Sequence, residues 1–189
     1  NELLWRFPRR RLEAEAIRDA ILFVSGQLDF TMGGSLMPLK DRTYVTGTAS
    51  KQQQYDNARR SVYQPIYRSA VYDMLTAFDF PDPATPTGNR QESTVAPQSL
   101  LMMNSQIVHT AASRLAAAAL AAHRFDSQRL EWLTLTLFGR RPTDEQRHAI
   151  LDYLQRRDGA SADGEKETRA QWESVCRVLL ASNEFIYID

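Results

Sequence analysis

Arg60-Ser-Val-Tyr-Gln-Pro-Ile-Tyr-Arg68 opens the segment around which we expect the chain to pack, and Phe78-Asp-Phe-Pro-Asp-Pro83 and Thr94-Val-Ala-Pro-Gln-Ser-Leu100 continue it. Aromatic residues, prolines, arginines and acids crowd together here without the spacing of an amphipathic helix. Extended backbone carries N–H and C=O groups that a helix would satisfy internally, so a buried connector must find side-chain partners for them. We therefore expect residues 60–100 to thread between the first helix and the C-terminal helices.

The composition is that of an ordinary globular protein. Hydrophobic residues make up 43% of the 189 residues and charged residues 24%, which is enough to build one hydrophobic core. Lysine plus arginine and aspartate plus glutamate each number 23, so nothing favours nucleic acid or an anionic membrane as a partner. No apolar run approaches the roughly 20 residues that a membrane span needs. We expect a single helical domain over residues 1–189, and because the sequence starts without a methionine we expect it to be a domain cut from a larger protein.

Hydrophobic periodicity predicts a mainly α fold, an irregular bundle of about six helices. The first helix is expected at residues 12–28, with Pro8 in its first turn. Later helices are expected to start at or near Ala70, Pro97, Asn104 or Ser105, Ser127 and Thr143. The clearest buried stripe, in a last helix, consists of Trp172, Val175, Cys176, Leu179 and Leu180.

Helix ends carry recognisable capping signals. Ser93 or Thr94 is expected to accept orphan N–H groups at the start of the helix that Pro97 opens, and Ser127 to cap a later helix. Gly139 is expected to end that later helix. Thr143 and Gln146 have the spacing of a capping box, which predicts a clean new start.

Residues 29–58 lack an apolar pattern, and we expect a long, partly mobile surface loop there. Residues 43–46 have a strand-like composition, and residues 60–64 are rich in β-favouring side chains. The sequence therefore predicts at most a small β pairing between these two segments. The apolar tail, residues 185–188, must be covered by the rest of the fold.

Seven residues of the central segment form the candidate binding site. They are Arg60, Tyr63, Tyr67, Arg68, Asp79, Asp82 and Arg90. The two aspartates could act as an acid/base pair, or they could cap turns and pair with Arg60, Arg68 or Arg90. We favour structural pairing, with at least one carboxylate buried, because arginine abounds in the same segment. The tyrosines could stack on a sugar or a base, or serve as strand and interface residues.

Metal and cofactor motifs are missing from the sequence. His109, His123 and His148 lie on separate predicted helices without ligand spacing, and there is no cysteine pair or glycine-rich phosphate loop. Haem attachment would need a Cys-x-x-Cys-His run. Cys176 falls within an apolar stripe, so we interpret it as a small buried hydrophobe rather than a nucleophile. We expect no cofactor in this chain.

A series of short motifs, in order along the chain, resembles one family. They are Leu12-Glu-Ala-Glu-Ala-Ile-Arg-Asp19, Gly33-Gly34, Arg60-Ser-Val-Tyr63, Phe78-Asp-Phe-Pro-Asp-Pro83, Ser93-Thr-Val-Ala-Pro-Gln-Ser-Leu100 with Asn104, Phe138-Gly-Arg-Arg-Pro-Thr143 and Leu180-Ala-Ser-Asn-Glu-Phe185. The chain resembles the C-terminal domain of unknown function in large planctomycete-type secreted proteins, which often carry a cytochrome c-like domain and a second uncharacterised domain upstream. The resemblance covers nearly the whole chain, but residues 36–57 match no motif of that family.

The resemblance implies an exported, cell-envelope setting beside other domains of the same polypeptide, with any haem held by an upstream domain. It transfers no catalytic residue. We therefore predict a non-catalytic interaction or structural module, whose partner is another domain, a glycan or an envelope protein. The alternative is part of an enzyme for glycan or redox chemistry, with a site at Arg60, Tyr63, Asp79, Asp82 and Arg90. A pocket lined by these residues with a raised carboxylate pKa would favour the enzyme, and acids matched by arginines would favour the module.

Overall fold

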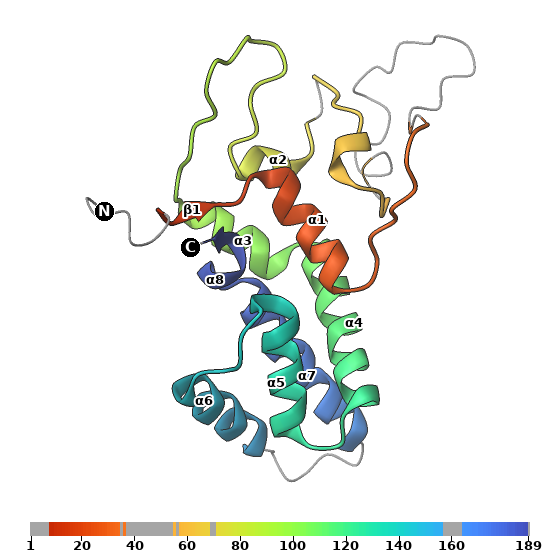
Figure 1. Cartoon of the computed structure of the whole chain (residues 1–189), viewed down its shortest axis with the longest axis vertical. Coiled ribbons are helices and arrows are strands. Elements are labelled where there is room, and N and C mark those ends of the chain that lie inside the picture. The colour runs from red at the N-terminus through yellow and green to blue at the C-terminus, as the bar shows by residue number, and fades with distance from the viewer. Residues whose placement is uncertain are drawn as a thin grey trace.

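The computed structural model (Figure 1) describes residues 8–34, 36, 55, 57–68, 71–156 and 164–188. The predicted mainly α class is confirmed, because these residues contain eight α-helices, one 3₁₀ turn and a two-stranded antiparallel sheet. In chain order the elements are β1 (Arg10–Arg11), α1 (Ala14–Val24), η1 (Ser61–Tyr63), α2 (Asp73–Ala77), α3 (Ala96–Asn104), α4 (Gln106–Ala122), α5 (Asp126–Phe138), α6 (Asp144–Gln155), α7 (Gly164–Leu180), α8 (Asn183–Ile186) and β2 (Tyr187–Ile188).

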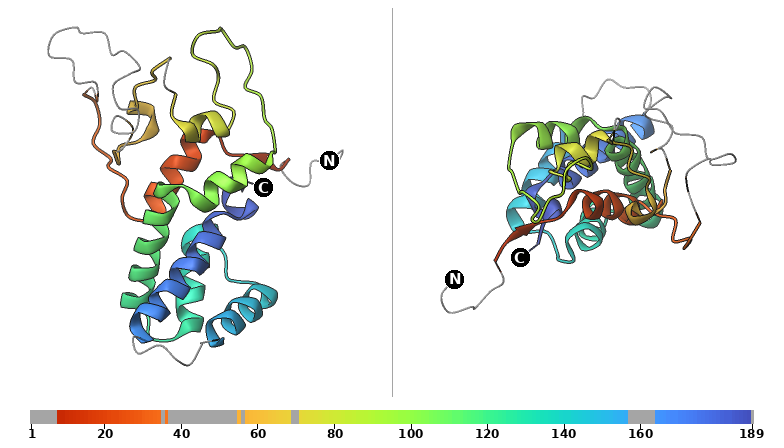
Figure 2. Two further views of the ribbon diagram at one scale, coloured as in Figure 1. Left: turned by 180° about the vertical axis from the view of Figure 1, so that it is seen from behind. Right: turned by 90° about the horizontal axis from the view of Figure 1, so that it is seen from above.

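The helices are arranged in two tiers along the longest axis of the molecule (Figure 1). In the lower tier α4 and α7 pack together and run in opposite directions, with α5 and α6 beside them. In the upper tier α1, α2 and α3 gather around the start of α4, and the connection between α2 and α3 projects beyond them. The view from behind shows the same grouping (Figure 2, left).

One hydrophobic core runs through both tiers. It includes residues from α1 through α8, and the predicted stripe of α7 lies wholly within it. Trp172 and Leu180 on α7 are fully buried, as are Val108 and Leu115 on α4. Alanines 111, 112, 116 and 119 are also buried on α4, and their small side chains let α7 approach closely. The periodicity of the last helix therefore predicted its buried face correctly.

The central segment packs between the first helix and the C-terminal helices, as the sequence predicted, only at α2 and α3. α2 contacts α1, and α3 contacts both α4 and α7, so these helices do lie between the first helix and the C-terminal ones. Between them, residues 82 and 84–89 are exposed. The prediction of a continuously buried connector is therefore wrong for the middle of the segment, which projects as a loop (Figure 1).

The first helix is shorter than its apolar pattern predicted. Pro8 precedes β1 and does not sit in a helical turn, and α1 runs only from Ala14 to Val24. Ser25 ends the helix by donating from its hydroxyl to the carbonyl of Ile21 at 2.7 Å. Gly26 then adopts a φ of 67°, a left-handed conformation that glycine accepts without strain. The helix therefore ends about four residues before the expected stop near residue 29, and a left-handed glycine follows it, as is common at helix C-termini.

The capping predictions gave mixed results. The box at the start of α6 is confirmed: the Gln146 N–H donates to the Thr143 hydroxyl at 3.2 Å, and the Thr143 N–H donates to the Gln146 side chain at 3.1 Å. Gly139 ends α5 with a φ of 68°, as expected. The expected caps at Ser93, Thr94 and Ser127 are wrong. α3 and α5 instead follow Val95 and Phe125, neither of which caps through its side chain.

The β pairing lies elsewhere than predicted. Residues 61–63 form a 3₁₀ turn rather than a strand, and residues 43–46 lie outside the described residues. The sheet instead pairs β1 with β2, with Arg10 opposite Ile188 and Arg11 opposite Tyr187. The apolar tail is covered in part: Phe185 and Ile186 of α8 are buried in the core, whereas Ile188 of β2 is 47% exposed.

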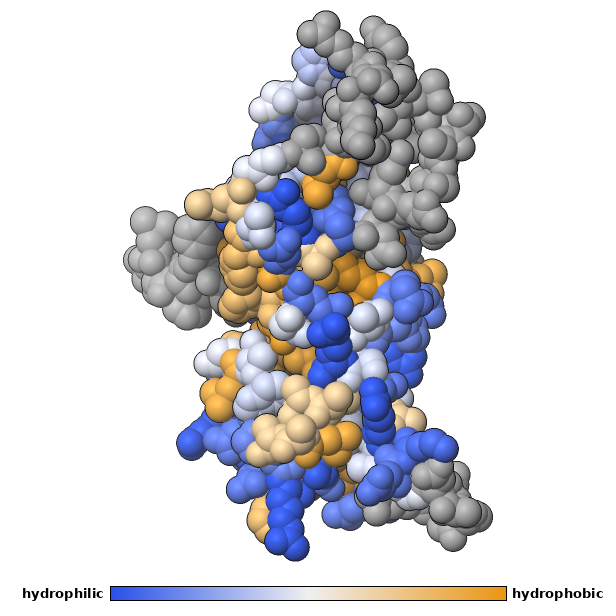
Figure 3. All heavy atoms as spheres, turned by 90° about the vertical axis from the view of Figure 1, so that its right-hand side faces the viewer, coloured by the Kyte–Doolittle hydropathy of each residue, from blue (hydrophilic) through white to orange (hydrophobic). Residues whose placement is uncertain are grey.

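Two other predictions fall wholly or partly on undescribed residues. Most of the predicted loop at residues 29–58 lies there, and so does Ala70, the expected start of the second helix. The described part of that helix is α2, and it starts at Asp73. The space-filling view shows hydrophobic and hydrophilic residues intermixed on the face to the right in Figure 1 (Figure 3).

Candidate functional site

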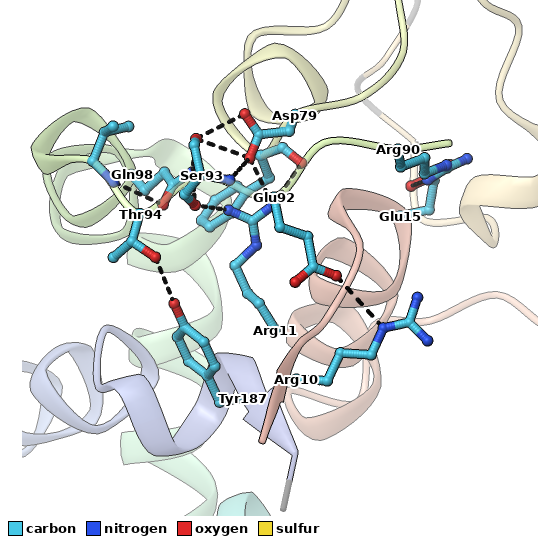
Figure 4. Close-up of polar contacts among 12 residues, drawn as sticks. Arg10, Arg11, Glu15, Asp79, Arg90, Glu92, Ser93, Thr94, Gln98 and Tyr187 are labelled. Atoms are coloured by element: carbon cyan, nitrogen blue, oxygen red, sulfur yellow. Dashed lines mark hydrogen bonds and ion pairs between the residues drawn. The ribbon is translucent and has the colours of Figure 1, made fainter. Parts of the chain in front are cut away.

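Asp79 is the centre of a polar cluster at the point where α2 gives way to the projecting loop. Its backbone has a φ of 59°, which aspartate tolerates better than most residues because its short side chain can hydrogen-bond locally. The carboxylate Oδ2 accepts from Arg11 Nη2 at 2.8 Å and from the Ser93 N–H at 2.8 Å. The Ser93 hydroxyl donates to Oδ1 at 2.8 Å. We call Arg11, Asp79, Ser93 and Gln98 the Asp79 cluster (Figure 4).

Arg11 reaches this cluster from β1. Its side chain is only 4% exposed, and its guanidinium also donates to the carbonyls of Ser93 and Phe78. A planar guanidinium can bridge a carboxylate and carbonyls at the same time, which suits this position. The expected bonds of an acid in the central segment to an arginine and to a backbone N–H are present at Asp79, but its side chain is only partly buried, at 21% exposed, rather than substantially buried. The arginine was mispredicted, since it is Arg11 rather than Arg60, Arg68 or Arg90.

The hydrogen bonds keep Asp79 ionised. Partial burial alone would raise the pKa of the Asp79 carboxyl. The Ser93 N–H, the Arg11 guanidinium and the Ser93 hydroxyl together outweigh that effect and hold the pKa below its ordinary value. A carboxylate with a lowered pKa is a weak base and a poor proton donor near neutral pH. The group is thus better suited to holding structure than to moving a proton.

The cluster also connects the loop to the C-terminal end of the fold. Gln98 on α3 donates from its amide to the Ser93 carbonyl at 3.1 Å. The next residue, Thr94, shares a 3.0 Å hydrogen bond with the Tyr187 hydroxyl on β2. Figure 4 shows Tyr187 approaching Thr94 from the side opposite Asp79. Ser93 and Thr94 therefore bind other parts of the fold and do not cap α3.

Arg90 is held by a separate ion-pair group at the start of α1. Its guanidinium makes two 2.8 Å bonds to the carboxylate of Glu15 and one of 3.1 Å to Glu13. The bonds to Glu15 raise the pKa of Arg90 above its ordinary value. The Arg90 guanidinium also lies 5.4 Å from the ring centre of Phe80. Figure 4 shows Arg90 beside Glu15 and well apart from Asp79.

Asp82 occupies an exposed turn of the loop. Its Oδ1 accepts from the Ala84 N–H at 2.8 Å, and its carbonyl accepts from the Thr85 N–H at 3.2 Å. This is the turn-capping role that the sequence offered as one alternative for the aspartates. No arginine contacts Asp82 among the described residues, so the predicted ion pair applies to Asp79 alone.

The other four predicted residues lie at η1, on a different side of α1 (Figure 1). Arg60 is 3.9 Å from Asp19, and the Tyr63 ring lies 4.4 Å from the Arg59 guanidinium. Tyr67 is buried, and Arg68 is exposed. The Tyr67 and Tyr55 rings meet edge to face at 5.9 Å, so Tyr67 offers no open stacking surface. The structure therefore divides the predicted site into two parts.

A buried arginine that the sequence analysis did not single out anchors the η1 part. Arg18 is 2% exposed and donates to the carbonyls of Arg59, at 2.8 Å, and Asn57. Burial lowers the pKa of Arg18, and nearby Tyr72 and Asp19 partly offset that effect. The signal was present in the sequence, because Arg18 lies four residues after Ala14 and three before Ile21, on the buried side of α1.

Asp19, the next residue, completes this anchor. Its Oδ1 accepts from both the N–H and the hydroxyl of Ser61, each at 2.7 Å. Both parts of the predicted site thus show a similar arrangement, in which an aspartate accepts from the N–H and hydroxyl of a serine far away in sequence. The Asp19 bonds fix irregular backbone against α1, whereas the Asp79 bonds tie the two ends of the projecting loop to each other.

Two open depressions flank the projecting loop, with volumes of about 330 and 480 Å³. The smaller is lined by Thr76, Asp79, Phe80, Pro81, Asp82, Thr87, Arg90 and Gln91. The larger lies between the loop and residues 10–13. Asp79, Asp82 and Arg90 of the predicted site therefore share one depression, whereas Arg60, Tyr63, Tyr67 and Arg68 line neither.

Comparison with protein families shows which family the chain belongs to. Residues 1–154 match the PSD1 family of proteins of unknown function (DUF1553). The chain belongs to this family. No curated protein and no solved structure shows significant similarity to it. The PSD1 match ends within α6, so α7, α8 and β2 lie beyond the matched residues.

Outside the candidate site, the described residues of this PSD1 chain include few groups that could act as a nucleophile or bind a metal. Cys176 is fully buried, and burial, with a smaller contribution from Glu173, raises the pKa of its thiol to about 12. The interpretation of Cys176 as a small buried hydrophobe is confirmed. Among the described residues, no three His, Cys, Asp or Glu side chains are grouped as metal ligands. In the same part of the chain, no helix has the length and apolar character to span a membrane.

Proposed function

We propose that this PSD1 chain is a non-catalytic interaction module, in which the residues of the central segment hold and present the projecting loop. The observation that carries the proposal is the state of Asp79, the most enclosed acid of the predicted site. Arg11 and Ser93 occupy both of its oxygens, and the pKa of the carboxyl is lowered rather than raised. An acid/base catalyst would need a freer carboxylate with a pKa closer to neutral.

The loop projects from the fold on a fixed base, which suits a surface that binds a partner. Its base is fixed by Asp79 and Ser93 on one side and by Arg90 with Glu15 on the other. Arg10 adds a looser contact of 3.5 Å with Glu92. Three prolines lie between these fixed points, and proline limits the conformations of a loop before it binds anything. Limiting the conformations of a loop lowers the entropy that binding costs.

The enzyme alternative has one supporting observation. Asp79, Asp82 and Arg90 line the same depression, as a catalytic site would require. Arg60 and Tyr63, which the alternative also needs, belong to the η1 part instead. Asp82 supports a turn, and Asp79 is held ionised. The geometry thus favours the interaction module.

We infer an exported, cell-envelope setting for the module, next to other domains of the same polypeptide, from the resemblance to planctomycete-type secreted proteins. We further propose that it needs no cofactor of its own, with any haem carried by an upstream domain. The single core that extends through α8 supports one domain that continues past the PSD1 match. Cell fractionation with an antibody against the chain tests the setting: we expect it in the envelope fraction, and a wholly cytoplasmic pool would contradict the inference.

The function itself can be tested by sedimentation. The purified chain is incubated with the envelope fraction of its source and pelleted, and the supernatant is examined by mass spectrometry for released products. We expect the chain to pellet with the envelope and to release nothing. A variant with residues 83–88 replaced by a Gly-Ser loop of equal length should stay in solution while keeping its helical circular dichroism. Released products that disappear in Asp82→Asn would instead support the enzyme.

A further inference from the structure

We propose that the smaller depression is a binding site for a neutral sugar unit of a glycan. This inference rests on the proposed function, because it names the ligand of the interaction module. The depression has a volume of about 330 Å³, which falls at the lower end of the range usual for small-molecule sites. The depression is open to solvent, so one sugar unit of a polysaccharide can enter it while the adjoining sugar units remain outside.

The polar groups of the depression have unused hydrogen-bonding capacity. Among the described residues, the Asp82 carboxylate accepts one hydrogen bond, at Oδ1, and its second oxygen accepts none. The side-chain amide of Gln91, an exposed residue of the lining, also makes no hydrogen bond to another described residue. Thr76 and Thr87 each donate a long bond, of 3.4 and 3.3 Å, to a carbonyl and keep their lone pairs free to accept.

This combination matches the chemistry of a sugar. A carboxylate accepts, an amide both donates and accepts, and hydroxyls do either, so together they can satisfy neighbouring sugar hydroxyls. The Phe80 ring adds a half-buried apolar surface, against which the C–H face of a pyranose can pack. A fully apolar ligand would displace water from these polar groups without replacing its hydrogen bonds, so the lining favours a ligand that carries hydroxyls.

The charges favour a neutral ligand over an anionic one. Arg90 is the nearest cation, and Glu15 and Glu13 already neutralise it. Asp79 is likewise paired with Arg11. Among the described residues, Asp82 is then the only charged residue of the lining without an oppositely charged partner. Its carboxylate would repel a phosphate, sulfate or uronate group. A neutral sugar meets no such repulsion.

Affinity electrophoresis of the full chain tests this site. The probes are four neutral polysaccharides, namely mixed-linkage β-glucan, xylan, galactomannan and dextran, with alginate as the anionic comparison. We expect at least one neutral polysaccharide to retard the protein and alginate to have no effect. The double variant Asp82→Ser, Gln91→Ala should bind at least tenfold more weakly. Serine can still accept from the Ala84 N–H, so the turn is expected to persist, and thermal melting checks this.

Glu92→Gln provides the matched control, because Glu92 lies on the same loop but lines only the larger depression. It should be retarded like the original chain. The proposal is overturned if none of the neutral probes retards the protein, if alginate alone does so, or if the folded double variant binds as well as the original. Should the sugar probes fail while the chain still pellets with the envelope, the interaction module stands and only its ligand class is wrong.

Discussion

Arg11 and Asp79 are 68 positions apart in the chain, yet the Arg11 guanidinium donates to the Asp79 carboxylate at 2.8 Å. Their side chains are 4% and 21% exposed, so the pair is largely shielded from solvent. The same arginine also binds the Ser93 carbonyl, while Asp79 accepts from the Ser93 N–H. The pair thus joins β1 to both ends of the projecting loop.

Removing the charge of Asp79 should destabilise the fold. We expect Asp79→Asn to lower the free energy of unfolding by about 2–3 kcal/mol, since it leaves the buried Arg11 without its counter-charge. Asparagine tolerates the left-handed backbone, so the effect reports the lost charge rather than strain. Urea denaturation measures it. Asp82→Asn, on the exposed turn, is the control and should change stability by less than about 0.5 kcal/mol. Equal effects for the two variants would disprove the special role of Asp79.

The same carboxylate should make stability depend on pH. The pKa of Asp79 in the folded chain lies below the ordinary value of 3.8, so its contribution is present above that pH. The contribution is lost as the pH falls through the lowered folded-state pKa. We expect the difference in melting temperature between the original chain and Asp79→Asn to be constant from pH 7 to about pH 5 and to shrink below about pH 4. A difference that grows on acidification would mean that the sign of the pKa shift is wrong.

Trp172 should be a major contributor to the core. It is fully buried on α7, and we expect Trp172→Ala to cost about 3–5 kcal/mol because it leaves a large cavity. Val178 lies on the same helix but is 66% exposed, which makes Val178→Ala a matched control with little expected effect. Chemical denaturation of both variants measures the difference. An unchanged unfolding midpoint for Trp172→Ala would show that the stripe does not hold the core together.

The domain should require the helices beyond the PSD1 match. Deleting residues 157–189 removes α7, α8 and β2, and so exposes the face of α4 that packs against α7. We expect this shortened chain to lose its cooperative thermal transition. Deleting only residues 187–189 removes β2 and should keep the transition at a lower temperature. A cooperative transition in the chain that ends at residue 156 would show that the matched residues fold alone.

Local signals in the sequence predicted local structure well. The stripe around Trp172, the left-handed Gly139 and the capping box of Thr143 depend on residues within one or two helical turns of each other. Such patterns are readable because the groups that interact are close in the chain. The same reasoning named Asp79 and Asp82 together without choosing between them: Asp82 serves the proline-rich turn, whereas Asp79 binds the distant Arg11 and Ser93.

Long-range partners could not be predicted in this way. Arginines close to Asp79 in sequence were the natural candidates, but β1 delivers Arg11 through a pairing of only two residues with β2. A two-residue strand carries no periodicity from which it could be recognised. Arg90 was assigned to the aspartates for the same reason, whereas the fold places Glu15 within its reach. Only the tertiary arrangement decides between such partners.

The most direct test of a structural, non-catalytic Asp79 is its own titration. The side-chain carboxyl carbon of Asp79 is followed by NMR in the full chain from pH 7 to pH 2, with Asp79→Asn used to assign the signal. We predict a midpoint below 3.8, because the Ser93 and Arg11 hydrogen bonds favour the ionised form. A midpoint above 3.8, and above all a carboxyl still protonated near neutral pH, would contradict the account and restore Asp79 as a candidate catalytic acid.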